Sequence, residues 1–277
     1  MSTGKNARQE APRFLIIPAA GLGTRMRTVD PGLPKELLPV GDKPAIQYAI
    51  EEGLSAGIKD IVIIISRQKE ILRQRIEEIY RNSGSISFSF LYQKDLSGEA
   101  DAIGCARDIA EGHAVAIIYP DNLYVPAPGA LTSLKTVFKG CGQDVIALNE
   151  VTEGLCRTLS NAGRADVVRR DENIYSITRF LPKGAGHFQP RFRGELRCCG
   201  ISLLGPHLFA YIERAQSFVR EGEFTDIYFR QLIMEEQGMT GCKLPGIVFD
   251  IGNPAGYAQC NEYIRRVKGP RDSGIEG

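Results

Sequence analysis

The chain has 277 residues, of which 43% are hydrophobic, and its formal net charge is +1 at pH 7. A chain of this length can bury the core of one large α/β domain, but its net charge creates no overall field to attract nucleic acid or a membrane surface. No apolar run approaches the ~20 residues of a transmembrane helix, and the N-terminus has no apolar signal core, so a cytoplasmic protein is predicted. The seven cysteines include no C-x-x-C pair, which favours free thiols in a reducing compartment.

The first patterned stretch is a short apolar run followed by a loop that is rich in glycine. Phe14 to Ile17 predict a buried strand, and Pro18, Gly21 and Gly23 predict a tight turn directly after it. Glycine has no Cβ, so the backbone amides of such a turn can approach phosphate oxygens closely. The candidate nucleotide contacts in this turn are Ala20, Gly21, Leu22 and Gly23.

Two better-known glycine loops do not fit this stretch. The dinucleotide fingerprint G-x-G-x-x-G would need glycine at Met26, and the phosphate loop G-x-x-x-x-G-K followed by Ser or Thr has no match here. Lys35 lies between Pro34 and Glu36, in a segment without helical or strand periodicity, so a stiff loop holds this lysine. Arg25 and Lys35 would place positive charge on either side of a bound triphosphate. An ordinary strand-to-helix turn is the alternative.

Strand-like and helix-like segments alternate after the loop. They are a strand at 61–65, a helix at 69–81, a strand at 86–92, a helix at 98–107 and a strand at 114–119. Consecutive apolar residues, as at 61–65, are typical of parallel strands covered on both faces. The alternation predicts right-handed crossovers and an α/β fold, with an open, mostly parallel, Rossmann-like nucleotide-binding sheet that carries helices on both faces.

Polar residues follow two of these strands, at the edge where ligands bind in open α/β sheets. Gln93 follows the strand at 86–92, and its amide can both donate to and accept from a base. Gly98 opens the next helix. Asp121 follows the strand at 114–119, where a carboxylate predicts a magnesium ligand. A surface amide with a helix-start glycine, and an aspartate that only caps a turn, are the alternatives.

The second half of the chain has a different order of predicted elements. Three short strands, at 165–169, 174–178 and 197–204, are separated by loops rather than by helices, which predicts a smaller β-rich part. A later helix is expected to begin with Thr225 or Asp226 as its cap.

Three motifs together resemble the signature of the sugar-1-phosphate nucleotidyltransferases. They are Gly21-Leu22-Gly23-Thr24-Arg25-Met26, Pro34-Lys35-Glu36-Leu37-Leu38-Pro39-Val40, and Asp42-Lys43-Pro44 with Ile46-Gln47-Tyr48. Within that family the chain is most similar to the bacterial UTP-glucose-1-phosphate uridylyltransferases, including in the spacing from Gly21 to Lys35. The resemblance extends with gaps from Arg13 to Arg265 and is strongest over the first third of the chain.

The resemblance implies transfer of UMP from UTP to a sugar-1-phosphate such as glucose 1-phosphate, with release of pyrophosphate. It makes Arg25 and Lys35 catalytic. It further assigns base contacts to Gln93 and Gly98, and Mg²⁺ ligation to Asp121 and to Asp250, which follows the apolar run 247–249.

The resemblance also implies one nucleotidyltransferase domain at 13–268 and a homo-oligomer. A nucleotide-binding half (13–148) and a sugar-binding half (149–268) would share that domain. We expect a disordered leader at 1–12 and a mobile tail at 269–277.

The sugar side departs from the family pattern at three places. Phe180-Leu181-Pro182 stands for the family's Glu-Lys-Pro, Ala165-Asp166 for Tyr-Gly, and Gly194-Glu195 for an asparagine-containing approach to a strand. The candidate sugar-phosphate-binding residues are therefore Asp166, Arg179 and Lys183.

Three functions stay open on the sequence. The chain is a uridylyltransferase, a thymidylyltransferase that acts on a sugar-1-phosphate, or a nucleotide-binding relative with an altered sugar site and no transfer activity. The retention of Arg25, Lys35, Asp121 and Asp250 favours an active transferase over a binding module.

Overall fold

The computed structural model describes residues 10–160, 163–182 and 186–268. Most of the predicted leader, the predicted tail 269–277 and the candidate Lys183 lie outside the described residues. Residues 10–12, at the end of the predicted leader, have no regular secondary structure. Within the described ranges, no helix combines the length and apolarity that crossing a membrane requires.

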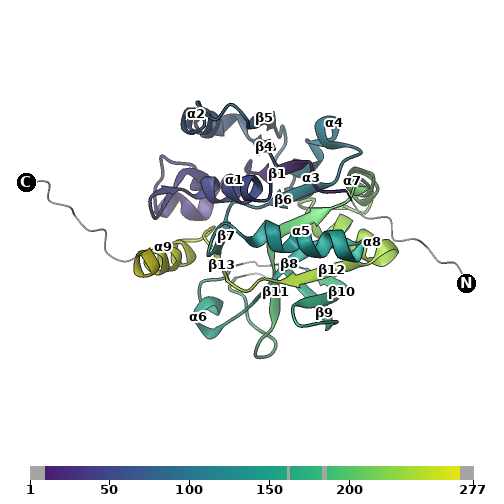
Figure 1. Ribbon diagram of the computed structural model, residues 1–277. Coiled ribbons are helices and arrows are strands. Elements are labelled where there is room, and N and C mark those ends of the chain that lie inside the picture. The colour runs from purple at the N-terminus through teal and green to yellow at the C-terminus, as the bar shows by residue number, and fades with distance from the viewer. Residues whose placement is uncertain (1–9, 161–162, 183–185, 269–277) are drawn as a thin grey trace, which may run out of the picture.

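One nine-stranded sheet forms the centre of the molecule, in the order β5-β4-β1-β6-β11-β8-β12-β10-β9 (Figure 1). Its strands are β1 (Phe14–Pro18), β4 (Asp60–Ile65), β5 (Ser87–Tyr92), β6 (Val115–Ile118), β8 (Asp144–Glu150), β9 (Gly163–Arg169), β10 (Ile174–Leu181), β11 (Leu196–Leu204) and β12 (Met239–Lys243). Two smaller sheets pair β2 (Pro39–Val40) with β3 (Lys43–Pro44) and β7 (Asn122–Val125) with β13 (Ile247–Asp250).

The large sheet is mixed, so the prediction of an open, mostly parallel sheet is wrong in that respect. β5, β4, β1 and β6 are parallel neighbours, as predicted for the first half. β11 then runs antiparallel to both β6 and β8, and β10 runs antiparallel to β12 and β9. Because β11 lies between β6 and β8, the halves 13–148 and 149–268 interleave within one sheet. Apolar runs indicate strands, but they carry no information on strand direction.

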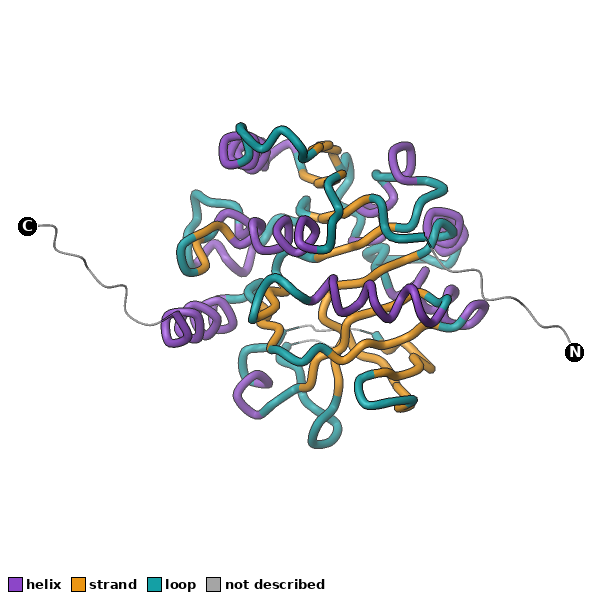
Figure 2. The backbone as a smooth tube through the Cα atoms, viewed as in Figure 1, coloured by secondary structure: helices purple, strands orange, loops and turns teal. Residues whose placement is uncertain are grey.

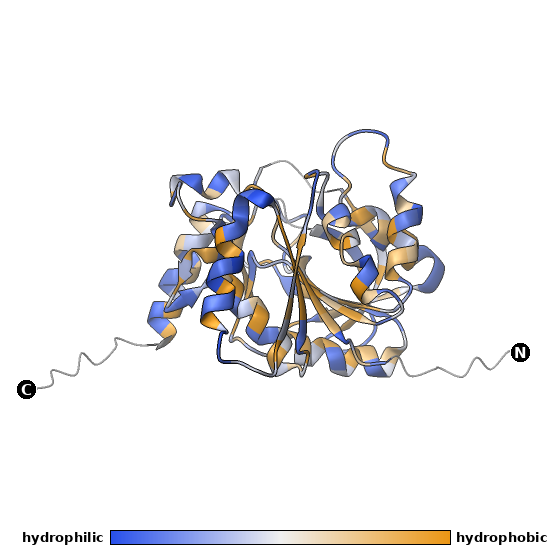
Figure 3. Cartoon of the chain, turned by 90° about the horizontal axis from the view of Figure 1, so that it is seen from above, coloured by the Kyte–Doolittle hydropathy of each residue, from blue (hydrophilic) through white to orange (hydrophobic). Residues whose placement is uncertain are grey.

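Helices cover both faces of the sheet, as predicted, and Figure 3 shows them on either side of it. The helices are α1 (Ala45–Ser55), α2 (Glu70–Ile79), α3 (Glu99–Gly104), α4 (Arg107–Ala110), α5 (Ala130–Cys141), α6 (Glu153–Cys156), α7 (Leu208–Gln216), α8 (Ile227–Gln237) and α9 (Pro254–Lys268). Figure 2 distinguishes them from the strands and loops of the same view.

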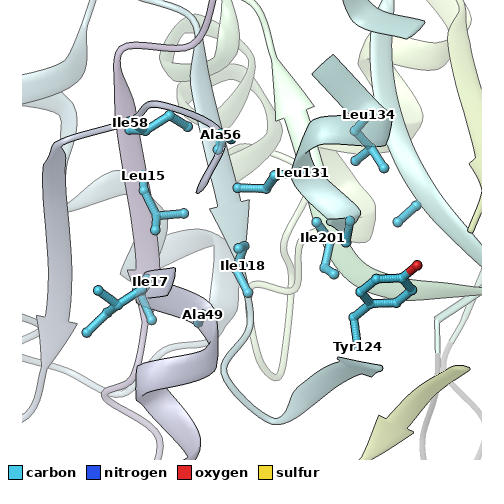
Figure 4. Close-up of a cluster of buried hydrophobic side chains, with 14 of the residues drawn as sticks. Leu15, Ile17, Ala49, Ala56, Ile58, Ile118, Tyr124, Leu131, Leu134 and Ile201 are labelled. Carbon is cyan, nitrogen blue, oxygen red and sulfur yellow. The ribbon is translucent and has the colours of Figure 1, made fainter. Parts of the chain in front are cut away.

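Alternate side chains of β1 supply the cores of both faces, because successive residues of a strand point to opposite sides. Leu15 and Ile17 pack with residues of α1 and α5, including Leu131 (Figure 4). Phe14 and Ile16 pack on the other face with residues of α3, α7 and α8. β1 is therefore buried on both sides, which explains its continuous apolar sequence.

The strand order reverses direction at β1. The chain passes from β1 outward to β4 and β5, and then crosses back to place β6 on the other side of β1. In α/β sheets, ligands bind outside the carboxyl ends of the strands at such a switch point. The segments that follow β1, β5 and β6 meet there.

Glu52 is a buried carboxylate that joins two helices. It lies in α1 and is 3% exposed. Its oxygens accept hydrogen bonds from the backbone N–H groups of Gly129, at 2.8 Å, and Leu131, at 3.1 Å, at the start of α5. Burial raises the pKa of Glu52, and these backbone donors act against that rise. The carboxylate thus satisfies N–H groups that have no partner within α5.

Replacement of Glu52 by alanine should lower the free energy of unfolding by about 2–4 kcal/mol, because the buried N–H of Leu131 and the partly buried N–H of Gly129 lose their acceptor. Chemical denaturation measures this change. The matched control is Glu77→Ala, which removes a half-exposed carboxylate from a surface ion pair and should cost less than about 1 kcal/mol. Equal losses in the two variants would contradict the assigned role of Glu52.

Candidate active site

A cavity of about 550 Å³ lies at the switch point. Its lining contains all the residues predicted to contact a triphosphate, a base or a metal, namely Ala20, Gly21, Leu22, Gly23, Arg25, Lys35, Gln93, Gly98, Asp121 and Asp250. These residues come from four separate parts of the chain, so the fold brings together groups that the sequence analysis selected one by one.

The glycine loop after β1 leads into two short 3₁₀ turns, Thr24–Thr28 and Lys35–Leu37. Gly23 has φ +60°, in the left-handed region that favours glycine. A Cβ atom on Gly23 would lie 3.3 Å from Cγ of Lys35, so a larger residue would press on the lysine. Gly23 therefore permits both the turn and the close approach of Lys35.

Lys35 faces the cavity as a charged group. Its Nζ atom lies 2.6 Å from Oδ2 of Asp121. Burial acts to lower the pKa of Lys35, but the carboxylates of Asp121 and Glu36 outweigh burial and raise the pKa to about 12. The lysine is consequently protonated at any physiological pH and can neutralise a phosphate.

A buried ion pair holds the two parts of the loop together. Lys69, at the N-terminal end of α2, donates to both carboxylate oxygens of Glu36, at 2.9 and 2.8 Å, and to the carbonyl oxygen of Ala19, at 2.8 Å. Glu36 is 2% exposed and Lys69 is 5% exposed. Ala19 directly follows β1 and Glu36 directly follows Lys35, so Lys69 fixes the lysine relative to the glycine loop. The local sequence around Lys69 gives no sign of a buried lysine, so this role could not be predicted from it.

Asp121 and Asp250 lie beside each other at the ends of β6 and β13. In the β7–β13 pair, Asp250 is opposite Asn122, the residue after Asp121. A Cβ atom on Gly252 would lie 3.0 Å from Oδ2 of Asp121 and 3.2 Å from Oδ1 of Asp250. Both carboxylates therefore border the same small space, which stays open because residue 252 has no side chain.

Ser160 connects Asp250 to Arg25. The N–H and Oγ–H groups of Ser160 both donate to Oδ2 of Asp250, each at 2.8 Å. Arg25, which is exposed, donates to Oγ of Ser160. Arg25 thus lies near the second carboxylate, to which Ser160 connects it.

Arg197 connects the segment that carries Asp121 to the segment that carries Asp250. It is 1% exposed, and it donates to Oδ1 of Asn122 at 3.2 Å and to the carbonyl oxygen of Val248 at 2.6 Å. Asn122 in turn donates to Oδ1 of Asp121 at 3.0 Å. Arg197 also lines the cavity, and its buried Nε has no hydrogen-bond partner among the described residues. The sequence analysis did not select Arg197, since its position within β11 gives no sign of these distant partners.

The structure places Asp166 and Arg179 away from the candidates named above. Neither is among the described residues that line the cavity. Asp166 pairs with Arg191 at 2.7 Å, and Arg179 is exposed on β10. The cavity is lined instead by other arginines, which are Arg25, Arg164, Arg197 and Arg230.

Asp226 is the N-cap residue of α8, as the sequence predicted, but its side chain makes no capping hydrogen bond. Oδ2 of Asp226 instead accepts from Arg230, at 2.9 Å, and from the hydroxyl of Tyr119, at 3.0 Å. All three side chains line the cavity. An aspartate before a helix looks the same in the sequence whether its side chain caps the helix or faces a cavity, so only the fold distinguishes the two roles.

The family model for nucleotidyl transferases matches residues 15–154 of the chain. This chain therefore belongs to the nucleotidyl transferase family.

A UTP–glucose-1-phosphate uridylyltransferase of Staphylococcus saprophyticus is 28% identical to the chain over 263 residues, which cover 88% of this chain and 89% of that protein. The protein of the same name from Staphylococcus haemolyticus is 26% identical over 264 residues, with the same coverage.

Solved structures share the fold. A crystal structure of a UDP-glucose pyrophosphorylase complexed with UDP-glucose superposes with a TM-score of 0.79 at 24% identity, covering 92% of this chain and 99% of that chain. A putative glucose-1-phosphate thymidylyltransferase from Bacillus anthracis gives a TM-score of 0.73 at 19% identity, covering 93% of this chain and 97% of that chain.

Replacement of Lys69 by methionine should lower the free energy of unfolding by about 3–5 kcal/mol, because the buried Glu36 carboxylate loses its partner. The double variant Lys69→Met with Glu36→Leu should recover most of that loss, since neither charge then remains buried. Affinity for a nucleoside triphosphate should stay reduced in the double variant, because Lys35 is no longer tied to the glycine loop. Chemical denaturation and titration with the triphosphate measure the two effects.

The matched control for this experiment is Lys59→Met, which replaces an exposed lysine directly before β4. It should change neither stability nor affinity beyond about 0.5 kcal/mol. A double variant that regained both stability and full triphosphate affinity would show that the ion pair does not position Lys35.

Proposed function

We propose that this protein transfers UMP from UTP to a sugar-1-phosphate such as glucose 1-phosphate, giving a nucleotide sugar and pyrophosphate. The observation that carries this proposal is the meeting of Lys35, the glycine loop and the carboxylates of Asp121 and Asp250 around one cavity. Its volume of about 550 Å³ is in the usual range for sites that bind small molecules. The names of the uridylyltransferase relatives support the same activity.

The reaction requires two anionic groups to approach each other. A phosphate oxygen of the sugar-1-phosphate forms a new bond to the α-phosphorus of the triphosphate. The bond from the α-phosphorus to the oxygen that bridges to the β-phosphorus breaks, and pyrophosphate leaves with that electron pair. Positioning and charge neutralisation suffice for such a transfer, without a covalent intermediate on the protein. Lys35 and Arg25 would neutralise the triphosphate and the departing pyrophosphate, and the amides of the glycine loop would orient it.

The donor set at Asp121 and Asp250 fits Mg²⁺. Magnesium prefers oxygen ligands and is usually held by one or two carboxylates together with substrate phosphates and water. Two carboxylates border the open space beside Gly252. In the described part of the chain, no cluster of three or more His, Cys, Asp or Glu side chains offers a more complete cage. When bound there, the ion would supply positive charge for the reacting phosphates.

The phosphate of the acceptor needs cationic partners of its own. The sequence analysis proposed Asp166, Arg179 and Lys183 for this part. We favour the arginines that line the cavity over Arg179, because Arg197 and Arg230 each have a buried N–H group without a partner among the described residues. A phosphate oxygen would provide the missing acceptor for such groups.

A thymidylyltransferase is the second candidate. The fold it shares with the putative thymidylyltransferase from Bacillus anthracis is compatible with this function. Uracil and thymine present the same hydrogen-bonding edge, so Gln93 does not separate them. The cytoplasmic location and the homo-oligomer stay predictions of the sequence analysis.

The experiment that tests the proposed function crosses each nucleoside triphosphate with a panel of sugar-1-phosphates in the presence of Mg²⁺, and measures pyrophosphate release by the purified protein. We expect the highest turnover with UTP. The variants Asp121→Ala and Asp250→Ala should lose turnover, which excludes a contaminating activity. Thermal stabilisation by nucleotide without turnover in any combination would contradict a transferase and support the binding module.

Replacement of Gly252 by alanine should raise the Mg²⁺ concentration needed for half-maximal turnover by at least about tenfold. The new Cβ atom would lie 3.0 Å from Oδ2 of Asp121 and 3.2 Å from Oδ1 of Asp250, so each carboxylate would have to shift by a few tenths of an ångström and lose its alignment toward a shared ion. Mg²⁺ titration of the initial rate measures this change, and direct binding of Mn²⁺ followed by electron paramagnetic resonance provides a readout without turnover.

Gly84→Ala is the matched control for this prediction, because no atom lies within 4 Å of a Cβ placed on Gly84. It should leave the Mg²⁺ dependence unchanged. An unchanged metal affinity in Gly252→Ala would remove the metal site from Asp121 and Asp250.

A further inference from the structure

The amide of Gln93 is held in a fixed orientation. Gln93 lines the cavity and is 5% exposed. Its Nε2 donates to Oδ2 of Asp101 at 2.7 Å and to the carbonyl oxygen of Gly98 at 3.0 Å. Asp101 lies in the first turn of α3 and is not among the described residues that line the cavity.

The chemistry of these two partners determines which end of the amide faces them. A carboxylate and a carbonyl group only accept hydrogen bonds, so the NH₂ end must point toward them. The orientation therefore does not depend on telling nitrogen from oxygen by their positions. Oε1 is left at the cavity as an acceptor, and no donor in the described part of the chain pairs with it.

The loop at Gly98 packs closely against Phe224, which fixes the position of the Gly98 carbonyl that Gln93 contacts. It has φ +127°, and a Cβ atom there would lie 2.5 Å from the carbonyl oxygen of Phe224. The N–H of Ala100 donates to the same carbonyl at 2.9 Å, and the N–H of Phe224 donates to the carbonyl of Ser97 at 2.6 Å. The loop that carries the Gly98 carbonyl is thus clamped to a second segment, so this acceptor cannot easily move away from Gln93.

We propose that Asp101 is a positioning residue that sets base specificity. By holding the NH₂ end of Gln93, it presents only an acceptor to the base. This inference rests on the proposed function, in which the cavity binds a nucleoside triphosphate. Uracil and thymine bring an N–H donor at N3, and guanine brings one at N1, whereas cytosine N3 and adenine N1 are acceptors. Asp101 therefore selects UTP against CTP and ATP without touching the nucleotide.

The preference for UTP over CTP should be large, because Oε1 of Gln93 and N3 of cytosine are both acceptors and would face each other without a hydrogen bond. Sites built to hydrogen-bond one substrate strongly reject an analogue that leaves the protein group unpaired. A hydrogen bond to a charged group such as Asp101 is also stronger than one between neutral groups. Loss of the carboxylate leaves only the carbonyl of Gly98 to hold the NH₂ end of Gln93. The amide should then rotate more often and offer its NH₂ end to cytosine.

The test compares Asp101→Asn with the wild-type protein, using the ratio of kcat/KM for UTP to kcat/KM for CTP. In this variant the residue at 101 can donate as well as accept, so only the carbonyl of Gly98 still favours one orientation of Gln93. We expect the ratio to fall by roughly tenfold or more, in line with the loss of one charge-assisted hydrogen bond. Asp101→Ala should shift the ratio in the same direction.

Asp108→Asn is the matched control, because Asp108 is an exposed aspartate of the neighbouring helix α4. It should keep the wild-type ratio. Equal losses of activity with UTP and CTP in folded Asp101→Asn, with the ratio unchanged, would overturn the inference, because a purely structural role lowers both rates together.

A measurement on the wild-type protein keeps the inference testable if the variants fail to fold. N3-methyl-UTP has no N3–H donor, whereas 5-methyl-UTP keeps it. We expect the wild-type protein to bind 5-methyl-UTP like UTP and to reject N3-methyl-UTP and CTP. Binding of all four with equal affinity would overturn the inference.

Equilibrium binding separates this inference from the proposed function. Absence of turnover with every nucleotide and sugar-1-phosphate would contradict the transferase, but nucleotide binding followed by calorimetry would still report selection of UTP over CTP. Turnover that shows no preference between UTP and CTP would leave the transferase in place and overturn the role of Asp101.

Discussion

The buried ion pair between Lys69 and Glu36 is the interaction on which the geometry of the glycine loop and Lys35 depends. The loop after β1 contains Gly21 and Gly23, so few of its own side chains are available to hold its shape. Lys69 supplies the missing restraint through the carbonyl of Ala19 and the carboxylate beside Lys35. A buried ion pair of this kind contributes little net stability. Its effect here is geometric, because it fixes the position of Lys35 relative to the backbone amides of the glycine loop.

The same principle recurs elsewhere in the cavity. Arg197 links Asn122 to Val248 and so places Asp121 next to Asp250, and Asp101 orients Gln93. In each case a buried or partly buried charged side chain fixes the position or the orientation of a group that lines the cavity. Pre-organisation of this type removes reorganisation cost at the moment of reaction, which is how an enzyme without a covalent intermediate gains rate.

The sequence predicted the parts of this site that depend on local patterns. Apolar or alternating runs predicted β1, β5 and β6. The glycine loop after β1, Gln93 after β5 and Asp121 after β6 line one cavity, as the rule for strand ends suggests. The supporting residues were missed because their partners lie far away in sequence, as Lys69 and Arg197 illustrate. Strand direction could not be predicted either, because the apolar sequence of β11 does not show whether the strand runs parallel or antiparallel to its neighbours. The placement of Asp166 and Arg179 followed family correspondence alone, and the structure puts neither among the described residues of the lining.

The central claim is that one cavity holds both substrates and that transfer occurs in a single displacement. Isotope exchange between labelled pyrophosphate and UTP tests it most directly. With Mg²⁺ and no sugar-1-phosphate, we predict no label in UTP, because no step can release pyrophosphate without the acceptor. Addition of glucose 1-phosphate should start the exchange. Incorporation of label into UTP in the absence of any acceptor would reveal a covalent nucleotidyl intermediate and would contradict the account.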